Sequence, residues 1–284
     1  MTYRTILSTA ALALALMISP VAGNAQDQTV KIAAEGAYAP WNFTEGGTLK
    51  GFDIDLANDL CARAKLTCEI IPQAWDGIIP GLNAGKYDAI MAAMGITAKR
   101  REAIEFSIPY ARARNGFFVS KNSDLAKLPG TGESFNLAGN TDAAKAEIDK
   151  MRPLLQGKVI GVQTSSTNAS FLDTYFKGVV EVREYKTSEE AELDLLSDRV
   201  DAIVQSNISL ATTKKNPKFE AYEIFGPTFF GGPFGTGVGI GLRKDDVKLK
   251  ETFDKAIEAA VSDGTVARLA KKWFEVDVTP IAQK

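Results

Sequence analysis

Short apolar runs alternate with amphipathic segments along most of the chain, and turn residues separate them. Apolar runs bounded by Gly, Pro, Asn or Asp predict buried strands, which we expect near residues 30–33, 68–72, 89–91, 159–162, 180–185, 202–204 and 238–242. Apolar positions at helical spacing predict helices at residues 53–64, 77–84, 167–176, 188–196, 248–263 and 266–274. This alternation is typical of an α/β protein with mostly parallel sheets.

One supersecondary pattern occurs twice in the chain. LNAGKYDAIMAAM, from Leu82, and LDLLSDRVDAIVQSN, from Leu193, each run from a helix end through a charged turn into a short apolar strand. Each strand then leads into small or polar residues, at 92–95 in the first copy and at 205–207 in the second. Chance similarity between ordinary βα units is the alternative. A true repeat predicts two lobes whose strand ends face one cleft.

Two further segments carry organisational information. Residues 122–156 combine PGTGESFNLAGN with the amphipathic AAKAEIDKMRPLL, which predicts a polar surface excursion carrying a helix. The run GGPFGTGVGIG, from Gly231, predicts either a hinge or a tight turn before a strand, because glycine adopts backbone angles closed to other residues.

Composition excludes several classes of function but says little about the fold. The chain has 284 residues, of which 45% are hydrophobic, so it can form one large domain or two ordinary ones. Thirty-three basic and 35 acidic residues give a net charge of −2, which argues against a nucleic-acid partner. Histidine is absent, which excludes Ser-His-Asp and Cys-His catalysis and every histidine metal site.

The amino terminus has the three-part layout of a secretory signal. Arg4 precedes the apolar run ILSTAALALALMI, and small residues follow at 23–25. A membrane anchor is the alternative, but the run is shorter than the ~20 residues that span a bilayer. We expect residues 1–25 to be a signal peptide and the mature protein to be periplasmic.

Four segments near the start of the mature chain form a recognisable set: EGAYAPWNF (35–43), GFDIDLANDLC (51–61), WDGIIPGLNAGKYDAI (75–90) and GITAKRREAIEFSIPY (95–110). Their order and spacing resemble family 3 of the periplasmic solute-binding proteins, the polar-amino-acid binders, and within it the octopine and nopaline binders. The resemblance covers nearly all of the mature chain. It implies a two-lobed type II binding-protein fold, with a mostly parallel, helix-flanked sheet in each lobe and a two-strand hinge.

The resemblance also implies how the lobes divide. Lobe 1 would be discontinuous, with residues 27–113 and 233–284, and lobe 2 would be residues 114–232. Two strands near residues 114–119 and 230–237 would cross between the lobes. Residues 122–156 look like an insertion relative to the basic amino-acid binders, a feature shared with the opine binders.

Four residues of the set suit a zwitterionic ligand with a cationic tail. A carboxylate at Glu35 and aromatic faces at Tyr38 and Trp75 can hold a guanidinium or ammonium group. Arg100 follows Thr97 in a TxxR pattern, so Thr97 can cap a short helix while Arg100 turns toward the loop. The resemblance implies that Arg100 grips the ligand's α-carboxylate in a bidentate pair. A core aromatic or a solvated charge is the ordinary alternative for each.

Other candidates lie in loops after strands. Gln163, Ser166 and Thr167 stand between a strand and a helix, where amides and hydroxyls can bind an anion as well as cap the helix. Ala92 and Ala93 occupy the matching loop of the first copy. We expect all five to line the ligand site.

Three positions bear on ligand identity. The resemblance places an aspartate at position 206 in basic and polar amino-acid binders, where it pairs with the ligand's ammonium, but this chain has Ser206. A neutral hydroxyl suits the substituted amine of an opine better than a free ammonium. Gly95 replaces a serine common in the family and would leave room for the N-substituent, to which Asn115 could donate.

Cys61 and Cys68 are the two cysteines of the chain. An oxidising compartment would let them pair, free buried thiols are the alternative, and related binding proteins carry a bridge in this place.

These features lead to one prediction of function. We expect a monomeric periplasmic component of an ABC importer that binds an arginine-derived opine by lobe closure. We expect no cofactor, no metal and no catalytic group. Arginine or another cationic amino acid is the alternative ligand, and a secreted enzyme on the same scaffold is an alternative from another class, with Glu35 as its one obvious acid or base.

Overall fold

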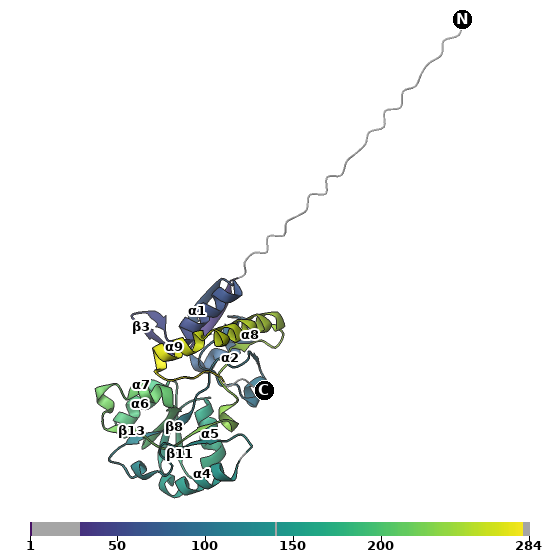
Figure 1. Cartoon of the computed structure of the whole chain (residues 1–284). Helices are drawn as coiled ribbons and strands as arrows, with labels where there is room; N and C mark the ends of the chain where they lie inside the picture. The colour runs from purple at the N-terminus through teal and green to yellow at the C-terminus, as the bar shows by residue number, and fades with distance from the viewer. Residues whose placement is uncertain (2–28, 140, 281–284) are drawn as a thin grey trace.

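Two β-sheets, each flanked by helices, organise the protein (Figure 1). The computed structural model describes Met1 and residues 29–139 and 141–280. Apart from Met1, the predicted signal peptide at residues 1–25 lies outside the described residues, as do residues 27 and 28 at the predicted start of lobe 1.

The first sheet has the strand order β5-β1-β6-β14-β7 and forms the part that we call lobe 1. Its strands are β1 (Val30–Ala34), β5 (Cys68–Pro72), β6 (Ala89–Ile90), β7 (Glu105–Phe106) and β14 (Gly241–Leu242). Its helices are α1 (Phe52–Ala64), α2 (Ile78–Asn83), α3 (Ala98–Arg101), α8 (Val247–Ser262) and α9 (Thr265–Phe274). Because β14, α8 and α9 come from the end of the chain, this lobe is discontinuous in sequence.

Both faces of the first sheet are buried. Ile32 packs in the core formed with α1, α8 and α9, whereas its neighbour Ala33 packs with α2 on the opposite face. This follows from the two-residue period of a strand, and it explains why β1 reads as a continuous apolar run. Figure 1 shows α1, α8 and α9 lying together on one side of this lobe.

A small sheet of short strands connects β1 to α1. It consists of β2 (Ala37–Tyr38), β3 (Asn42–Glu45) and β4 (Thr48–Lys50), paired antiparallel. The sequence pattern does not predict it, because these strands are short and largely polar.

The second sheet has the strand order β11-β10-β12-β8-β13-β9 and forms lobe 2. Its strands are β8 (Asn115–Ser120), β9 (Ser134–Asn136), β10 (Val159–Gln163), β11 (Glu181–Tyr185), β12 (Ala202–Ser206) and β13 (Tyr222–Phe230). Its helices are α4 (Asp142–Leu155), α5 (Thr167–Phe176), α6 (Ser188–Leu196) and α7 (Asn207–Thr213). β8 runs antiparallel to both β12 and β13, so this sheet is mixed.

The segment predicted as a polar surface excursion is more integrated than expected. β9 pairs with β13 at the edge of the second sheet. The apolar side of α4 enters the core of lobe 2, where Ile148, Met151 and Leu155 are buried. The amphipathic pattern predicted the helix, but only the tertiary structure shows the face against which it packs.

The predicted repeat is present in three dimensions. β1 pairs in parallel with β5 and β6, and β10 pairs in parallel with β11 and β12 in the same arrangement. The backbone N–H of Lys31 donates to Asp88 at 3.0 Å, and that of Val159 donates to Asp201 at 2.8 Å. The charged turns of both copies therefore fasten the start of the neighbouring strand.

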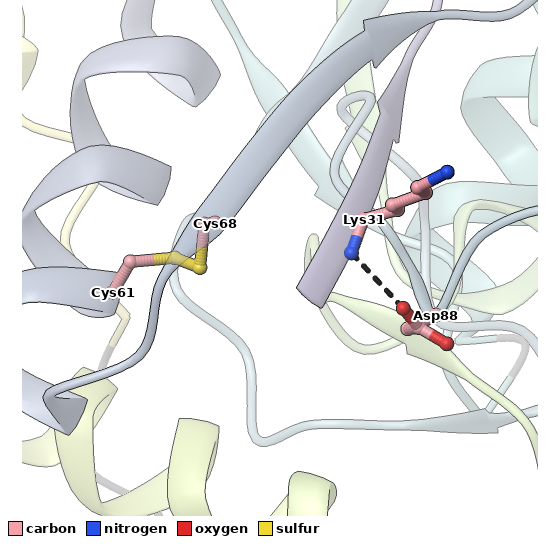
Figure 2. The surroundings of a disulfide bond; sticks show 4 residues. All are labelled: Lys31, Cys61, Cys68 and Asp88. Atoms are coloured by element: carbon pink, nitrogen blue, oxygen red, sulfur yellow. Dashed lines mark hydrogen bonds between the residues drawn. A yellow bond between two sulfur atoms is a disulfide. The ribbon is translucent and has the colours of Figure 1, made fainter. Parts of the chain in front are cut away.

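The disulfide lies next to the first of these turns. Figure 2 shows Cys61 on α1 bonded to Cys68 at the start of β5, with the Lys31–Asp88 hydrogen bond nearby. The predicted pairing is confirmed, and neither cysteine is free.

Two crossings connect the lobes. The first runs through residues 107–114 and the second through residues 231–240, and Ala111 and Val238 form an antiparallel bridge between them. The strand predicted near residues 114–119 is β8, which lies within the second sheet, because its continuous apolar pattern belongs to a buried strand. In the glycine-rich second crossing, a Cβ on Gly235 would lie 2.0 Å from the Ile96 carbonyl oxygen. We keep the exact lobe boundaries, 27–113 with 233–284 and 114–232, as a proposal.

Candidate functional site

A cavity of about 340 Å³ lies between the lobes, lined by the loops that follow β1, β6, β10 and β12. The sequence singled out twelve binding residues, and all of them line this cavity: Glu35, Tyr38, Trp75, Ala92, Ala93, Gly95, Arg100, Asn115, Gln163, Ser166, Thr167 and Ser206. They converge because the carboxyl ends of parallel strands meet at one edge of each sheet. Their contact with a ligand stays a prediction.

Glu35 directly follows β1 and is 8% exposed. Its carboxylate accepts a hydrogen bond of 2.6 Å from the Gln163 side-chain amide, which comes from lobe 2. Burial raises the Glu35 pKa to about 7, although the bond from Gln163 lowers it. No cation among the described residues pairs with Glu35, and a buried carboxylate in this situation is well suited to receive a cation.

Arg100 lines the same cavity and carries a positive charge, opposite to that of Glu35. The Thr97 side chain caps α3 by accepting from the Arg100 backbone N–H at 3.2 Å, as the TxxR pattern predicted. The guanidinium donates to the Gly95 carbonyl at 3.0 Å and lies 5.1 Å from the centre of the Trp75 ring. Burial lowers the Arg100 pKa to about 10. Within the described part of the chain no carboxylate pairs with Arg100, so its charge is available to an anion.

Three hydrogen bonds close the cleft. Besides the Gln163–Glu35 bond, the Trp75 indole N–H donates to the Thr164 carbonyl at 3.0 Å, and Arg100 donates to the Ser165 carbonyl at 3.2 Å. Three successive residues, the last of β10 and the two that follow it, thus contact lobe 1. The structure therefore represents a closed arrangement of the lobes.

Ser206 and Asn115 face each other on paired strands of lobe 2. Ser206 is 3% exposed, and its hydroxyl caps α7 by accepting from the Ile208 N–H at 3.3 Å. Gln205 is one of the residues predicted at 205–207 to follow the strand of the second copy. Its side-chain amide donates to Glu192 on α6, and it does not line the cavity. Tyr38, from β2, also lines the cavity, and burial raises the pKa of its phenol.

Gly95 lines the cavity, and its predicted role in making room for an N-substituent stays a prediction. A Cβ at this position would lie 3.1 Å from the Phe234 carbonyl oxygen and 3.2 Å from Cγ2 of Thr167. The missing side chain therefore lets the Gly95 backbone approach Thr167 of lobe 2 closely in the closed form. Ser166 caps α5 by accepting from the Ala169 N–H at 3.1 Å, and capping and lining the cavity coexist there.

Several residues that sequence reasoning missed also line the cavity: Trp41, Arg112, Ala113, Asn136, Ala138, Ser188, Phe230 and Phe234. Asn136 belongs to β9 and Ala138 follows it, so the segment predicted as an insertion contributes to the wall. Trp41 lies in the first of the four quoted segments, but nothing local singles it out as a lining residue, and no motif marks Arg112 or Ala113. Their roles depend on where β9 and the crossings lie in space.

The described residues hold no group of three or more cysteine, aspartate or glutamate side chains that could bind a metal ion. Glu35 is the one carboxylate among the described residues that line the cavity.

Comparison with known proteins agrees with this geometry. The family described as "Bacterial extracellular solute-binding proteins, family 3" matches residues 30–276. The chain belongs to this family. The resemblance seen in the sequence is thereby confirmed, and the fold is that of the type II periplasmic amino-acid-binding proteins.

Family 3 members with known ligands are similar over almost the whole chain. An octopine-binding periplasmic protein of Rhizobium meliloti is 47% identical over 281 residues, which cover 92% of this chain and 95% of that protein. A histidine-binding periplasmic protein of Escherichia coli (strain K12) is 34% identical over 272 residues, 94% of this chain and 95% of that protein. The solved structure of an ancestral arginine-binding protein bound to arginine has a TM-score of 0.72 at 32% identity, covering 87% of this chain and 98% of that one.

These relatives are binding proteins, which points to a binding protein here rather than an enzyme. The two curated relatives are periplasmic, which supports a periplasmic location for this family member. Within the described ranges, no helix has the length and apolar character needed to cross a membrane.

Proposed function

We propose that this solute-binding protein captures an arginine-derived opine of the octopine or nopaline type and delivers it to an inner-membrane ABC permease. The observation that supports this best is the composition of the cavity. It presents a buried acid at Glu35, an unpaired cation at Arg100 and a neutral hydroxyl at Ser206. The similarity to an octopine-binding protein points to the same ligand class.

The two charges suit the two ends of an arginine-like ligand. The guanidinium would pair with Glu35, and the α-carboxylate would take the fork of Arg100, whose planar donors match a carboxylate. One face of the Trp75 ring already meets Arg100. Its other face and the Tyr38 ring would then hold the tail.

An opine carries a second carboxylate and a substituted amine, and the cavity has features for both. Ser206 faces the amine without demanding the full ammonium charge that an aspartate would. Beyond Asn115 the lining continues to Arg112 and Asn136, which could receive the second carboxylate. Asn136 comes from the segment that this chain is expected to share with the opine binders.

Closure of the lobes would provide the mechanism. The three hydrogen bonds between the loop at residues 163–165 and lobe 1 close the wall around the ligand, and opening requires rotation about the two crossings. Closure changes the shape of the surface that a permease would bind. A single chain completes the cavity, so we also propose a monomer.

Arginine is the second candidate ligand, because Glu35 and Arg100 would serve it equally and an arginine-binding structure is similar. An enzyme on this scaffold is less well supported. General acid–base chemistry at a substrate needs at least one positioned proton donor or acceptor, usually with a partner, and no second carboxylate accompanies Glu35 among the described lining residues.

A ligand panel tests the proposal. Thermal shift and calorimetry would use octopine, nopaline, arginine, histidine and glutamine with the mature protein. A ligand at a thousandfold excess over Kd stabilises the folded state by about 4 kcal/mol, which gives a clear shift. We expect an opine to bind most tightly. A preference for arginine over both opines by tenfold or more would refute the opine assignment and leave the arginine one.

A further inference from the structure

A buried carboxylate lies behind the cavity wall, outside the set of lining residues. Asp53, in the first turn of α1, is 0% exposed. It accepts three hydrogen bonds of 2.8 Å each: from the Asn42 side-chain amide, from the backbone N–H of Ala93 and from the Tyr110 hydroxyl. Within the described chain no cation pairs with it. Burying an unpaired carboxylate is costly, so its presence here calls for a reason.

The donors show what the carboxylate connects. Asn42, also fully buried, accepts the backbone N–H of Gly36 at 2.9 Å, so Asp53 reaches the loop that carries Glu35. Ala93 belongs to the loop that also carries Gly95, whose carbonyl accepts from Arg100. One oxygen, Oδ2, receives both of these arms.

The Ala93 arm secures an unfavourable conformation. Ala93 has a φ of 49°, in the left-handed region that is unfavourable for a residue with a side chain. Such a conformation persists when surrounding bonds determine it, and the Ala93 N–H points directly at Asp53. The Tyr110 hydroxyl makes the third hydrogen bond, and Tyr110 lies in the first crossing between the lobes, next to Ala111, which bridges to Val238.

We propose that Asp53 is a positioning residue for ligand binding: through Asn42 and Ala93 its carboxylate holds the Glu35 loop and the Gly95 loop in one fixed geometry. The inference rests on the proposal that the cavity binds the ligand. The groups that contact the ligand come from separate loops, and an error of about 1 Å between them weakens every contact made by both. Oδ2 of Asp53 links the two loops, directly at the Ala93 N–H and through Asn42 at the Gly36 N–H.

Two substitutions distinguish the hydrogen bonds of Asp53 from its negative charge. Asp53→Ala removes both arms, and we expect affinity for octopine and arginine to fall roughly 10- to 100-fold. Asp53→Asn can turn its oxygen toward Asn42 and Ala93 and donate its amide to the Tyr110 oxygen, so we expect affinity within about threefold of wild type. Phe253→Leu, in the core of lobe 1 on α8, is the matched control: it should lower thermal stability and leave the affinity of the folded protein unchanged.

Calorimetry reports Kd and the bound fraction separately. A merely structural role for Asp53 would lower the bound fraction or the melting temperature without changing Kd, as in Phe253→Leu, and that outcome would overturn the inference. If Asp53→Ala does not fold, Asn42→Ala removes only the arm to the Glu35 loop. It should weaken arginine and octopine at least fivefold, and unchanged Kd values would equally overturn the inference.

Hydrogen exchange on the ligand-free protein gives a readout that does not depend on the ligand. The Gly36 and Ala93 amides should be protected in wild type and in Asp53→Asn, and exchange at least tenfold faster in Asp53→Ala than in Phe253→Leu. If wild type binds neither octopine nor arginine, the proposed function fails. The exchange measurement still tests whether Asp53 holds the two loops. Unchanged exchange in Asp53→Ala would overturn the inference by itself.

Discussion

Replacing Glu35 with glutamine should remove both most of the affinity for a guanidinium ligand and the pH dependence of binding. Glu35 is 8% exposed, and burial raises its pKa to about 7, with the Gln163 hydrogen bond acting in the opposite direction. A cationic tail favours the ionised carboxylate and therefore lowers this pKa in the complex. Below pH 7, binding must accordingly release a proton.

The size of the effect follows from that value. In the closed, ligand-free cleft, a pKa of about 7 leaves about nine tenths of the Glu35 side chains ionised at pH 8 and about one tenth at pH 6. Wild-type affinity for arginine or octopine should therefore fall about tenfold between pH 8 and pH 6, and roughly tenfold more at pH 5. In Glu35→Gln, loss of a buried charge pair costs ~2–5 kcal/mol, or about 30-fold to several thousandfold in affinity at pH 8.

Calorimetry in buffers of different ionisation enthalpy measures both quantities. Wild type should release about 0.9 proton per ligand at pH 6 and about 0.1 at pH 8, whereas Glu35→Gln should release none. Glu45→Gln is the matched control, because Glu45 is an exposed acid at the end of β3 that pairs with Lys50 and does not line the cavity. Burial also raises the Asp53 pKa to about 7, so Asp53→Asn should be measured as well and should keep the pH dependence. A wild-type affinity that changes less than twofold between pH 6 and pH 8 would refute the reasoning.

Three further predictions concern other parts of the protein. Arg100→Ala should weaken every carboxylate ligand by ~2–5 kcal/mol, since the anion would be buried without its partner, and a loss smaller than about threefold by calorimetry would exclude Arg100 as the anchor. Ser206→Asp can still cap α7, because aspartate is a good N-cap, so the protein should fold normally. It should raise affinity for arginine and lower that for octopine, and competition binding that shows the ratio moving less than threefold would contradict the role given to Ser206. The double substitution Cys61→Ala and Cys68→Ala should cost ~2–3 kcal/mol of unfolding free energy with Kd unchanged, and an altered Kd in calorimetry would show that the bridge influences the cleft.

Local sequence determined the elements whose ends carry their own signals. The helices predicted at residues 167–176 and 188–196 coincide with α5 and α6. Ser166 caps the first, and Thr187 with Glu190 forms a capping box at the start of the second. Such signals lie within a few residues of each other, so they can be read directly.

Strands depend on partners that are distant in the sequence. β2, β3 and β4 are short, and their pairing rather than their composition defines them. Only residues 241–242 of the strand predicted at 238–242 form β14, while Val238 makes isolated bridges to Gly95 and Ala111. The pattern predicted an extended segment there, and the tertiary structure decided which residues pair.

The candidate site divides in the same way. The sequence identified twelve lining residues because they follow strands or sit in segments that resemble a known family, and both kinds of signal are local. Arg112 carries no such mark, and although Asp53 and Asn136 sit in segments that carry the resemblance, nothing local distinguishes them from their neighbours. Only the fold buries Asp53 between two loops, and only the fold brings Glu35 within 2.6 Å of Gln163, 128 residues away. Sequence therefore determined which side chains are available, and tertiary structure decided their neighbours, their burial and hence their charge, because those depend on atoms far away along the chain.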